Sequence, residues 1–122
     1  MSRVIGRIPS HRLEERGSIK LDVEFRPGIE RNVLIIRYKE QAYAWLNACP
    51  HWGIDLGSND EEFWTVDKES LVCQMHQARF RPDDGYCTSG PCRGRSLMAL
   101  PLEESDGEVR IYKPLRKTQK NG

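Results

Sequence analysis

Hydrophobic and polar residues alternate along much of this chain, which is the pattern of half-buried β-strands. The clearest case is the segment IKLDVEF, in which Ile19, Leu21, Val23 and Phe25 fall on one face. Three pairs of similar runs each flank a short polar segment and therefore predict three hairpins. The pairs are NVLIIRY and AYAWLN around KEQ, FWTV and SLVCQ around DKE, and SLMALPLE and EVRIY around ESDG.

The rest of the chain contains little other regular structure. RVIGRI predicts another strand, RPGIER predicts a turn, and SHRLEERG predicts one loose helical turn. We therefore expect roughly eight to ten short strands and no long helix. This pattern favours an all-β fold, either a small antiparallel β-sandwich or a partly open barrel. We expect one domain over residues 1–112 and a basic, polar and flexible tail over residues 113–122.

Composition and charge exclude several classes of protein. The chain has 122 residues, of which 38% are hydrophobic and 30% charged, an ordinary globular balance. Its net charge of +1 gives no reason to expect nucleic-acid binding. The longest aliphatic run, VLII, is far shorter than the roughly 20 apolar residues of a membrane span. Because no apolar signal segment is present, we expect a cytoplasmic protein whose four cysteines are metal ligands or thiols rather than disulfides.

Two short boxes combine cysteine with histidine. The first box is Cys49-x-His51 and the second box is Cys73-x-x-His76, with 21 residues between them. A structural zinc site usually groups its cysteines in one knuckle and its histidines in another, so a mononuclear zinc site is the weaker alternative. Mixed boxes suit two metal ions, one held by the two thiolates and the other by the two imidazoles, with sulfides bridging the metals.

Both boxes resemble those of the Rieske ferredoxin family, and the resemblance extends from about Val4 to Tyr112. It includes the segment VLIIRYKEQAYAWLNACPH, the later GYCTSGPCRG and two closing strands. The resemblance implies a Rieske-type β-sandwich or barrel with a cluster-binding subdomain formed by two loops. It also implies one [2Fe–2S] cluster, held by Cys49 and Cys73 on one iron and by His51 and His76 on the other. Gln77 departs from the family pattern, which usually has glycine there.

The same resemblance separates two branches of the family. High-potential members of respiratory and photosynthetic complexes have two further cysteines, which form a disulfide, where this chain has Ile54 and Met75. They also have a serine and a tyrosine, which donate hydrogen bonds to the cluster, where this chain has Ala78 and Phe80. Fewer donors stabilise the reduced cluster less. We therefore expect a member of the soluble, low-potential branch.

Two functional classes fit this interpretation. The first is a monomeric one-electron carrier that accepts electrons from a flavin-dependent reductase and passes them to a terminal oxygenase or another acceptor. The second is the small Rieske-type subunit of a nitrite reductase or another multicomponent oxidoreductase. A complete oxygenase is not expected, because its mononuclear iron needs two further histidines and His11 alone remains. In either class the chain is an electron-transfer component and not an enzyme by itself.

The other candidate residues have simpler interpretations. Cys87 and Cys92 could form a local disulfide or a redox-active pair, but two thiols in a packed loop are preferred in a reducing compartment. His11 lies among charged residues and is expected at the surface. The three tryptophans are expected to pack in the core or in loops rather than to relay electrons; they are Trp45, Trp52 and Trp64.

Overall fold

The computed structural model describes residues 3–48, 63–73, 78–90 and 93–113. Across these residues the chain forms nine strands and one short 3-10 helix, which confirms the predicted all-β, antiparallel fold. No helix among the described residues is long and apolar enough to cross a membrane. The elements are β1 (Val4–Pro9), η1 (Ser10–Arg12), β2 (Ser18–Arg26), β3 (Ile29–Tyr38), β4 (Gln41–Leu46), β5 (Leu71–Val72), β6 (Arg79–Phe80), β7 (Cys87–Ser89), β8 (Leu102–Ser105) and β9 (Glu108–Tyr112).

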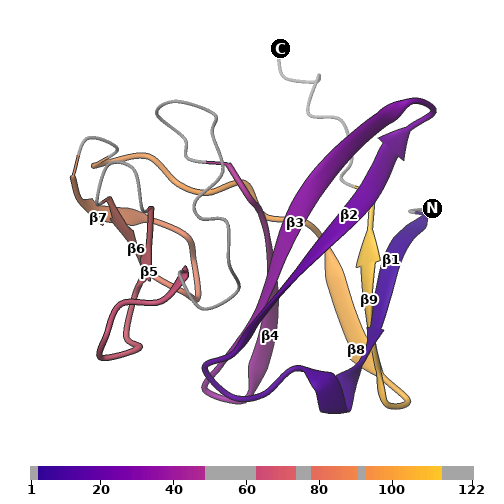
Figure 1. The fold of residues 1–122 in the computed structure, drawn as a ribbon, viewed down its shortest axis with the longest axis horizontal. Coiled ribbons are helices and arrows are strands. Elements are labelled where there is room, and N and C mark those ends of the chain that lie inside the picture. The colour runs from indigo at the N-terminus through magenta and orange to yellow at the C-terminus, as the bar shows by residue number, and fades with distance from the viewer. Residues whose placement is uncertain (1–2, 49–62, 74–77, 91–92, 114–122) are drawn as a thin grey trace.

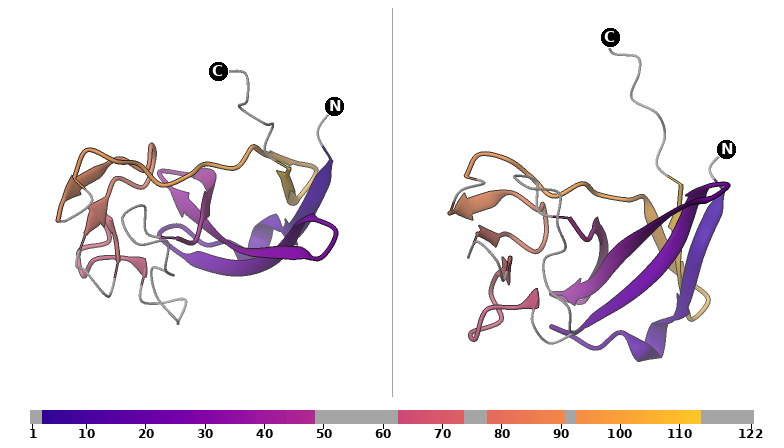
Figure 2. Two further views of the ribbon diagram at one scale, coloured as in Figure 1. Left: turned by 90° about the horizontal axis from the view of Figure 1, so that it is seen from above. Right: turned by 45° about the horizontal axis from the view of Figure 1, so that its top comes forward.

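The strands form three antiparallel sheets of three strands each (Figures 1 and 2). The sheet β2-β3-β4 lies in the middle of Figure 1, with β1-β9-β8 on one side and β5-β6-β7 on the other. We call the first two sheets the base. The small sheet β5-β6-β7 with its flanking segments, residues 63–73 and 78–97 as far as they are described, is called the small subdomain.

Strand β3 separates two hydrophobic cores. Its residues 33–36, the VLII run, are all 0% exposed. Leu34 and Ile36 belong to the first core, shared with the small subdomain, whereas Val33 and Ile35 belong to the second core, inside the base. A strand buried on both faces reads as a continuous apolar run, because both sets of alternating side chains must be hydrophobic.

Several local predictions are confirmed. Val23 is buried in the second core, and the other three apolar residues of the predicted face in β2 pack against that core. The KEQ hairpin joins β3 to β4, and the ESDG hairpin joins β8 to β9. At the first of these turns Lys39 and Glu40 have φ of 52° and 71°, as a two-residue type I′ turn requires. SHRLEERG contains one helical turn, η1, as predicted.

Three local predictions are wrong in detail. The turn predicted over RPGIER is shorter, because β3 already begins at Ile29. FWTV is not a strand: Trp64 makes a single bridge to Leu71, and β5 forms its ladder with β6. The strand predicted over SLMALPLE begins only at Leu102. The segment before it crosses from the small subdomain to the base, with Leu97 in the first core and Leu100 in the second, so no single partner strand can pair with it.

The ends of the domain are described only in part. The backbone N–H of Lys113 donates to the carbonyl of Arg3 at 2.8 Å, one residue beyond β9. The rest of the predicted tail, residues 114–122, lies outside the described residues. The division into a domain over residues 1–112 and a tail over residues 113–122 therefore stays a prediction.

Candidate metal centre

The second box begins where β5 ends. Val72 pairs with Arg79, and beyond this pair the backbone N–H of Cys73 donates to the carbonyl of Ala78 at 2.9 Å. The β5–β6 ladder therefore continues as far as Cys73. The Cys73 side chain is 0% exposed and lies in the first core. A sulfur on a backbone that is held in this way is well placed for metal binding, because rigid elements position ligands more accurately than free loops do.

The other three predicted ligands, Cys49, His51 and His76, lie outside the described residues. The structure does describe the segment that leads into the first box. Asn47 follows β4, is 3% exposed, and donates its backbone N–H to the carbonyl of Asn32 at 3.0 Å. Its side-chain Nδ2 donates to Oδ1 of Asn32 at 2.7 Å, and Nδ2 of Asn32 donates to Asp22 at 2.8 Å. This chain of amides fixes the position from which the first box starts.

A third segment packs against the second box. Gly90, just after β7, has φ of +95°, which favours glycine. A Cβ on Gly90 would lie only 2.7 Å from Cα of Ala78, so any side chain would force the two backbones apart. The backbone after β7 therefore touches the residue that closes the second box, and only glycine permits this approach.

Cys87 lies near this contact. It is 0% exposed, belongs to the first core with Cys73, and has its Sγ 3.1 Å from the carbonyl oxygen of Ser89. Cys92 lies outside the described residues, so the choice between packed thiols and a disulfide stays a prediction.

Replacing both Cys87 and Cys92 with serine is expected to leave the visible spectrum and the midpoint potential nearly unchanged. A serine hydroxyl at position 87 can still donate to the Ser89 carbonyl, so the packing of β7 should survive. Thiol counting on the denatured, metal-free wild-type protein should find four titratable cysteines. A count of two that rises on adding a reductant would instead demonstrate the disulfide.

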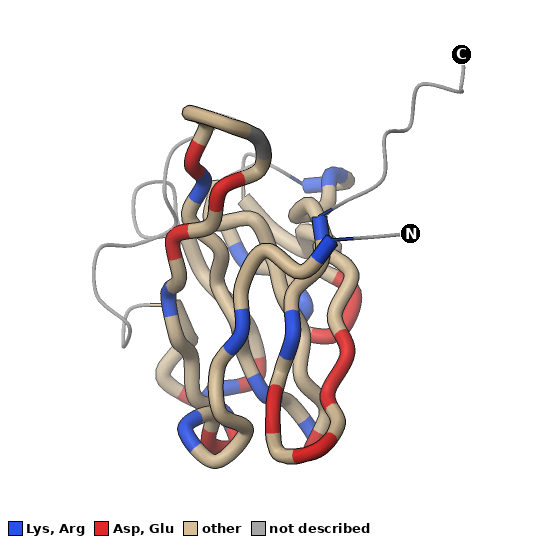
Figure 3. Tube along the Cα trace, turned by 90° about the vertical axis from the view of Figure 1, so that its right-hand side faces the viewer, with Lys and Arg blue, Asp and Glu red and all other residues tan. Residues whose placement is uncertain are grey.

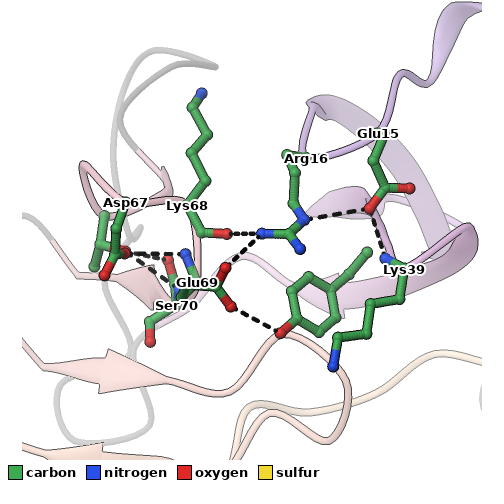
Figure 4. Close-up of polar contacts among 9 residues, drawn as sticks. Glu15, Arg16, Lys39, Asp67, Lys68, Glu69 and Ser70 are labelled. Carbon is green, nitrogen blue, oxygen red and sulfur yellow. Dashed lines mark hydrogen bonds and ion pairs between the residues drawn. The ribbon is translucent and has the colours of Figure 1, made fainter.

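An Arg16-centred network joins the base to the small subdomain (Figure 4). Arg16 Nη1 donates to the carbonyl of Lys68 at 2.6 Å and to Glu69 Oε2 at 3.1 Å. Its guanidinium lies 4.6 Å from the centre of the Tyr38 ring, and the Tyr38 hydroxyl donates to the other oxygen of Glu69 at 3.2 Å. We call Arg16, Tyr38 and Glu69 the Arg16 clasp. It holds the turn that leads directly into β5 and Cys73.

Charge and backbone conformation both support the clasp. The Glu69 carboxylate raises the pKa of Arg16, which stays cationic. Burial acts to raise the pKa of Glu15, but the N–H groups of Glu40 and Lys39, together with Arg16, lower it overall. Glu15 therefore stabilises the folded state at neutral pH, and that contribution disappears as the pH falls through its lowered pKa. Arg16 itself has φ of 62°, a conformation that its contacts must maintain.

Substitution of Arg16 by methionine is expected to accelerate iron release from the cluster roughly two- to fivefold, the range set by an exposed ion pair. The measurement is the loss of visible absorbance in the presence of an iron chelator, well below the unfolding temperature. Arg110→Met is the matched control, because Arg110 pairs with Glu103 and Glu108 within the β8–β9 hairpin of the base. Equal acceleration by both variants would show that the clasp has no specific effect on the metal centre.

The arrangement around Cys73 fits an iron–sulfur ligand. Thiolates are the soft ligands that iron–sulfur clusters require, and Cys73 offers its sulfur from a hydrogen-bonded hairpin inside an apolar core. Ala78 and Phe80, the predicted positions without hydrogen-bond donors, are both 0% exposed in the same core. Trp45 and Trp64 pack in this core as predicted, and His11 is exposed, whereas Trp52 lies outside the described residues.

Comparison with known proteins agrees with this geometry. Residues 11–113 match the family described as the Rieske [2Fe–2S] domain. The chain therefore belongs to this family, which confirms the predicted family and a single Rieske-type cluster as its cofactor. It is an electron-transfer component.

Individual relatives come from different systems. The chain is 32% identical over 114 residues to a protein from Haloferax mediterranei named as the Rieske subunit of a respiratory nitrate reductase. The match covers 81% of this chain and 49% of that protein. The chain therefore spans about half the length of that relative. Its fold is similar to the ferredoxin of carbazole 1,9a-dioxygenase from Nocardioides aromaticivorans IC177, with a TM-score of 0.68, 21% identity and coverage of 94% and 99% of the two chains. A chain in a solved complex of reduced oxygenase and oxidised ferredoxin gives a TM-score of 0.71, 20% identity and coverage of 94% and 95%.

Proposed function

We propose that this chain is a one-electron carrier. Cys49 and Cys73 hold one iron of its cluster, and His51 and His76 hold the other. The observation that carries the proposal is the hairpin that fixes a fully buried Cys73 beside Ala78 in a chain of the Rieske family. When bound, the cluster supplies reversible uptake of a single electron. The protein contributes ligands on two anchored segments and an apolar core that keeps water from the sulfur of Cys73.

The partners belong to the same proposal. A flavin-dependent reductase supplies electrons, and a terminal oxygenase or a similar enzyme accepts them. The support is the likeness in fold to a ferredoxin of a dioxygenase over nearly the whole of both chains. A monomer in the cytoplasm suits a carrier that must move between two enzymes.

A second candidate function is a Rieske-type subunit that stays within a multicomponent oxidoreductase, such as a nitrite reductase. The observation that favours it is the 32% identity to a protein named as a nitrate reductase subunit. The two candidates differ in whether the chain remains in a stable complex. Size-exclusion chromatography of a native cell extract separates them, because a carrier elutes at the mass of the chain alone and a subunit elutes with its reductase.

The carrier function is tested by reductive titration of the purified protein. We expect two irons and two sulfides per chain, uptake of one electron, and a Rieske-type electron paramagnetic resonance spectrum in the reduced state. The reduced protein should then return its electron to an added one-electron acceptor over repeated cycles without loss of iron. A colourless protein with one equivalent of zinc would disprove the proposal.

A further inference from the structure

The small subdomain carries four exposed arginines, Arg79, Arg81, Arg93 and Arg95. Over residues 78–90 and 93–97, four arginines against two aspartates leave a net charge of +2. On the face of the base seen in Figure 3, by contrast, positive and negative residues are interspersed along the strands. The turn before β5 adds Asp67, Lys68 and Glu69, so the described residues of the small subdomain carry a net charge of +1, and its excess of positive charge lies in residues 78–90 and 93–97.

Two of the four arginines lie at the end of the small sheet that carries the second box. Arg79 directly follows Ala78 and pairs with Val72, next to the hydrogen bond between Cys73 and Ala78. Arg93 lies at the same end, because its N–H donates to the carbonyl of Gly90 at 3.2 Å and Gly90 touches Ala78.

Arg95 lies farther along the small sheet, away from the second box. Its carbonyl accepts the N–H of Cys87 at 2.7 Å, so Arg95 runs alongside β7. Its side chain is exposed.

Two of the four acidic residues in the described part of the small subdomain lie at the opposite end of this sheet. Asp83 and Asp84 are in the turn between β6 and β7, away from the second box. Asp84 is already occupied, since both its oxygens accept hydrogen bonds from Arg81, at 3.0 and 2.7 Å. Arg81 in turn stacks on the Tyr86 ring at 4.9 Å, which fixes its guanidinium.

The remaining arginines, Arg79, Arg93 and Arg95, make no ion pair with any residue that the structure describes. The turn before β5 contains two acids, which are hydrogen-bonded to other groups, although the charge of Arg79 also contributes, after the hydrogen bond from Thr65, to the lowered pKa of Asp67. Asp67 accepts from the Thr65 hydroxyl at 2.6 Å and from the N–H of Glu69, and Glu69 is held by Arg16.

We propose that the exposed surface formed by Arg79, Arg93 and Arg95 is the docking surface for an acidic face of a redox-partner protein. A guanidinium offers bidentate hydrogen bonds to a carboxylate, and arginine is enriched where proteins bind each other. A positive surface beside the second box also steers a negatively charged partner toward Cys73, one of the proposed cluster ligands. The inference rests on the carrier function proposed above.

The test uses one haem protein in two charge states, native cytochrome c, which is basic, and the same protein with its lysines succinylated, which is acidic. Stopped-flow absorbance follows the transfer of one electron from the reduced chain to the ferric haem, which becomes ferrous. At low ionic strength the acidic form should react about tenfold faster or more. The difference should shrink as salt screens the charges.

Charge reversal then locates the surface. The double variant Arg79→Glu, Arg93→Glu should remove most of the advantage of the acidic cytochrome. The control is Arg31→Glu, which reverses an exposed arginine near the β2–β3 turn and should leave that advantage nearly unchanged. Equal effects of the double variant and the control, or a faster reaction with the native basic cytochrome, would overturn the docking surface while the carrier function stands. If neither cytochrome is reduced, the carrier function fails and the docking surface fails with it.

Discussion

Substitution of Cys73 by alanine is expected to yield a colourless protein without iron or acid-labile sulfide. In the ligand set proposed above, Cys73 supplies one of the two thiolates, and its side chain lies fully buried at the end of the β5–β6 ladder. Iron and sulfide analysis, visible absorbance and electron paramagnetic resonance of the dithionite-treated protein measure the loss.

Cys87→Ala is the matched control for this prediction. Cys87 is also 0% exposed and lies in the same core. Both variants therefore remove one buried sulfur atom and leave a cavity in that core. The Cys87 variant should keep its cluster with somewhat lower stability. Alanine at Cys49, His51 or His76 should abolish the cluster as completely as alanine at Cys73 does.

The segments around both boxes should also lose order when the cluster is lost, because metal binding and local folding are coupled. Hydrogen exchange of the amides near Cys73 and Asn47 should therefore speed up in the Cys73 variant, while that of β8 and β9 stays slow. A Cys73→Ala protein with its full iron content, or equal iron loss from the Cys87 variant, would contradict the ligand assignment.

The second large effect is expected on the midpoint potential. We predict a wild-type value in the lower part of the Rieske range, about −150 to 0 mV at neutral pH. Ala78 and Phe80 have no side-chain donor, and both side chains are completely buried in the core that contains Cys73. Stabilisation of the negative charge that arrives on reduction is therefore weak. The midpoint potential should not change with pH near neutrality, because the imidazoles of a low-potential cluster deprotonate only at alkaline pH.

Restoring a donor should raise the potential. Ala78→Ser and Phe80→Tyr each add one hydroxyl at a position where high-potential relatives have it. A hydrogen bond to a charged acceptor contributes about 1.5–3 kcal/mol, and only its strengthening on reduction counts. Because 1.4 kcal/mol corresponds to about 59 mV for one electron, we expect upward shifts of several tens of millivolts.

Protein-film voltammetry measures these shifts, and two controls show whether they depend on position. Phe63→Tyr adds a hydroxyl elsewhere in the first core, and Ala44→Ser adds one in the second core. Both controls should lower stability, since a buried hydroxyl without a partner is unfavourable, yet leave the potential nearly unchanged. A wild-type midpoint above about +150 mV would place the protein outside the low-potential part of the range.

The sequence by itself determined the features that depend on residues close together in the chain. Alternation in residues 19–25 fixed the buried face of β2, since side chains two apart share one face of a strand. The polar KEQ and ESDG segments fixed two hairpins, because the turn residues and their strands are neighbours. The spacing of the two boxes predicted a Rieske domain, and the family match confirms it.

The tertiary structure alone decided the features that depend on residues far apart in the chain. Nothing local shows that VLII divides its side chains between two cores, because a continuous apolar run fits either a buried strand or a buried helix. Trp64 follows a strand-like pattern, yet it makes only one bridge because β5 pairs with β6 instead.

The supports of the metal centre have the same origin. Asn47 is hydrogen-bonded to Asn32, which lies 15 residues away in the sequence, and Arg16 is hydrogen-bonded to Glu69, which lies 53 residues away. Gly90 has to be glycine only because the backbone of Ala78 lies against it. Patterns of neighbouring residues in the sequence indicate which segments can form strands and which residues can bind metal. The contacts described here, by contrast, arise only when the folded sheets bring distant segments together.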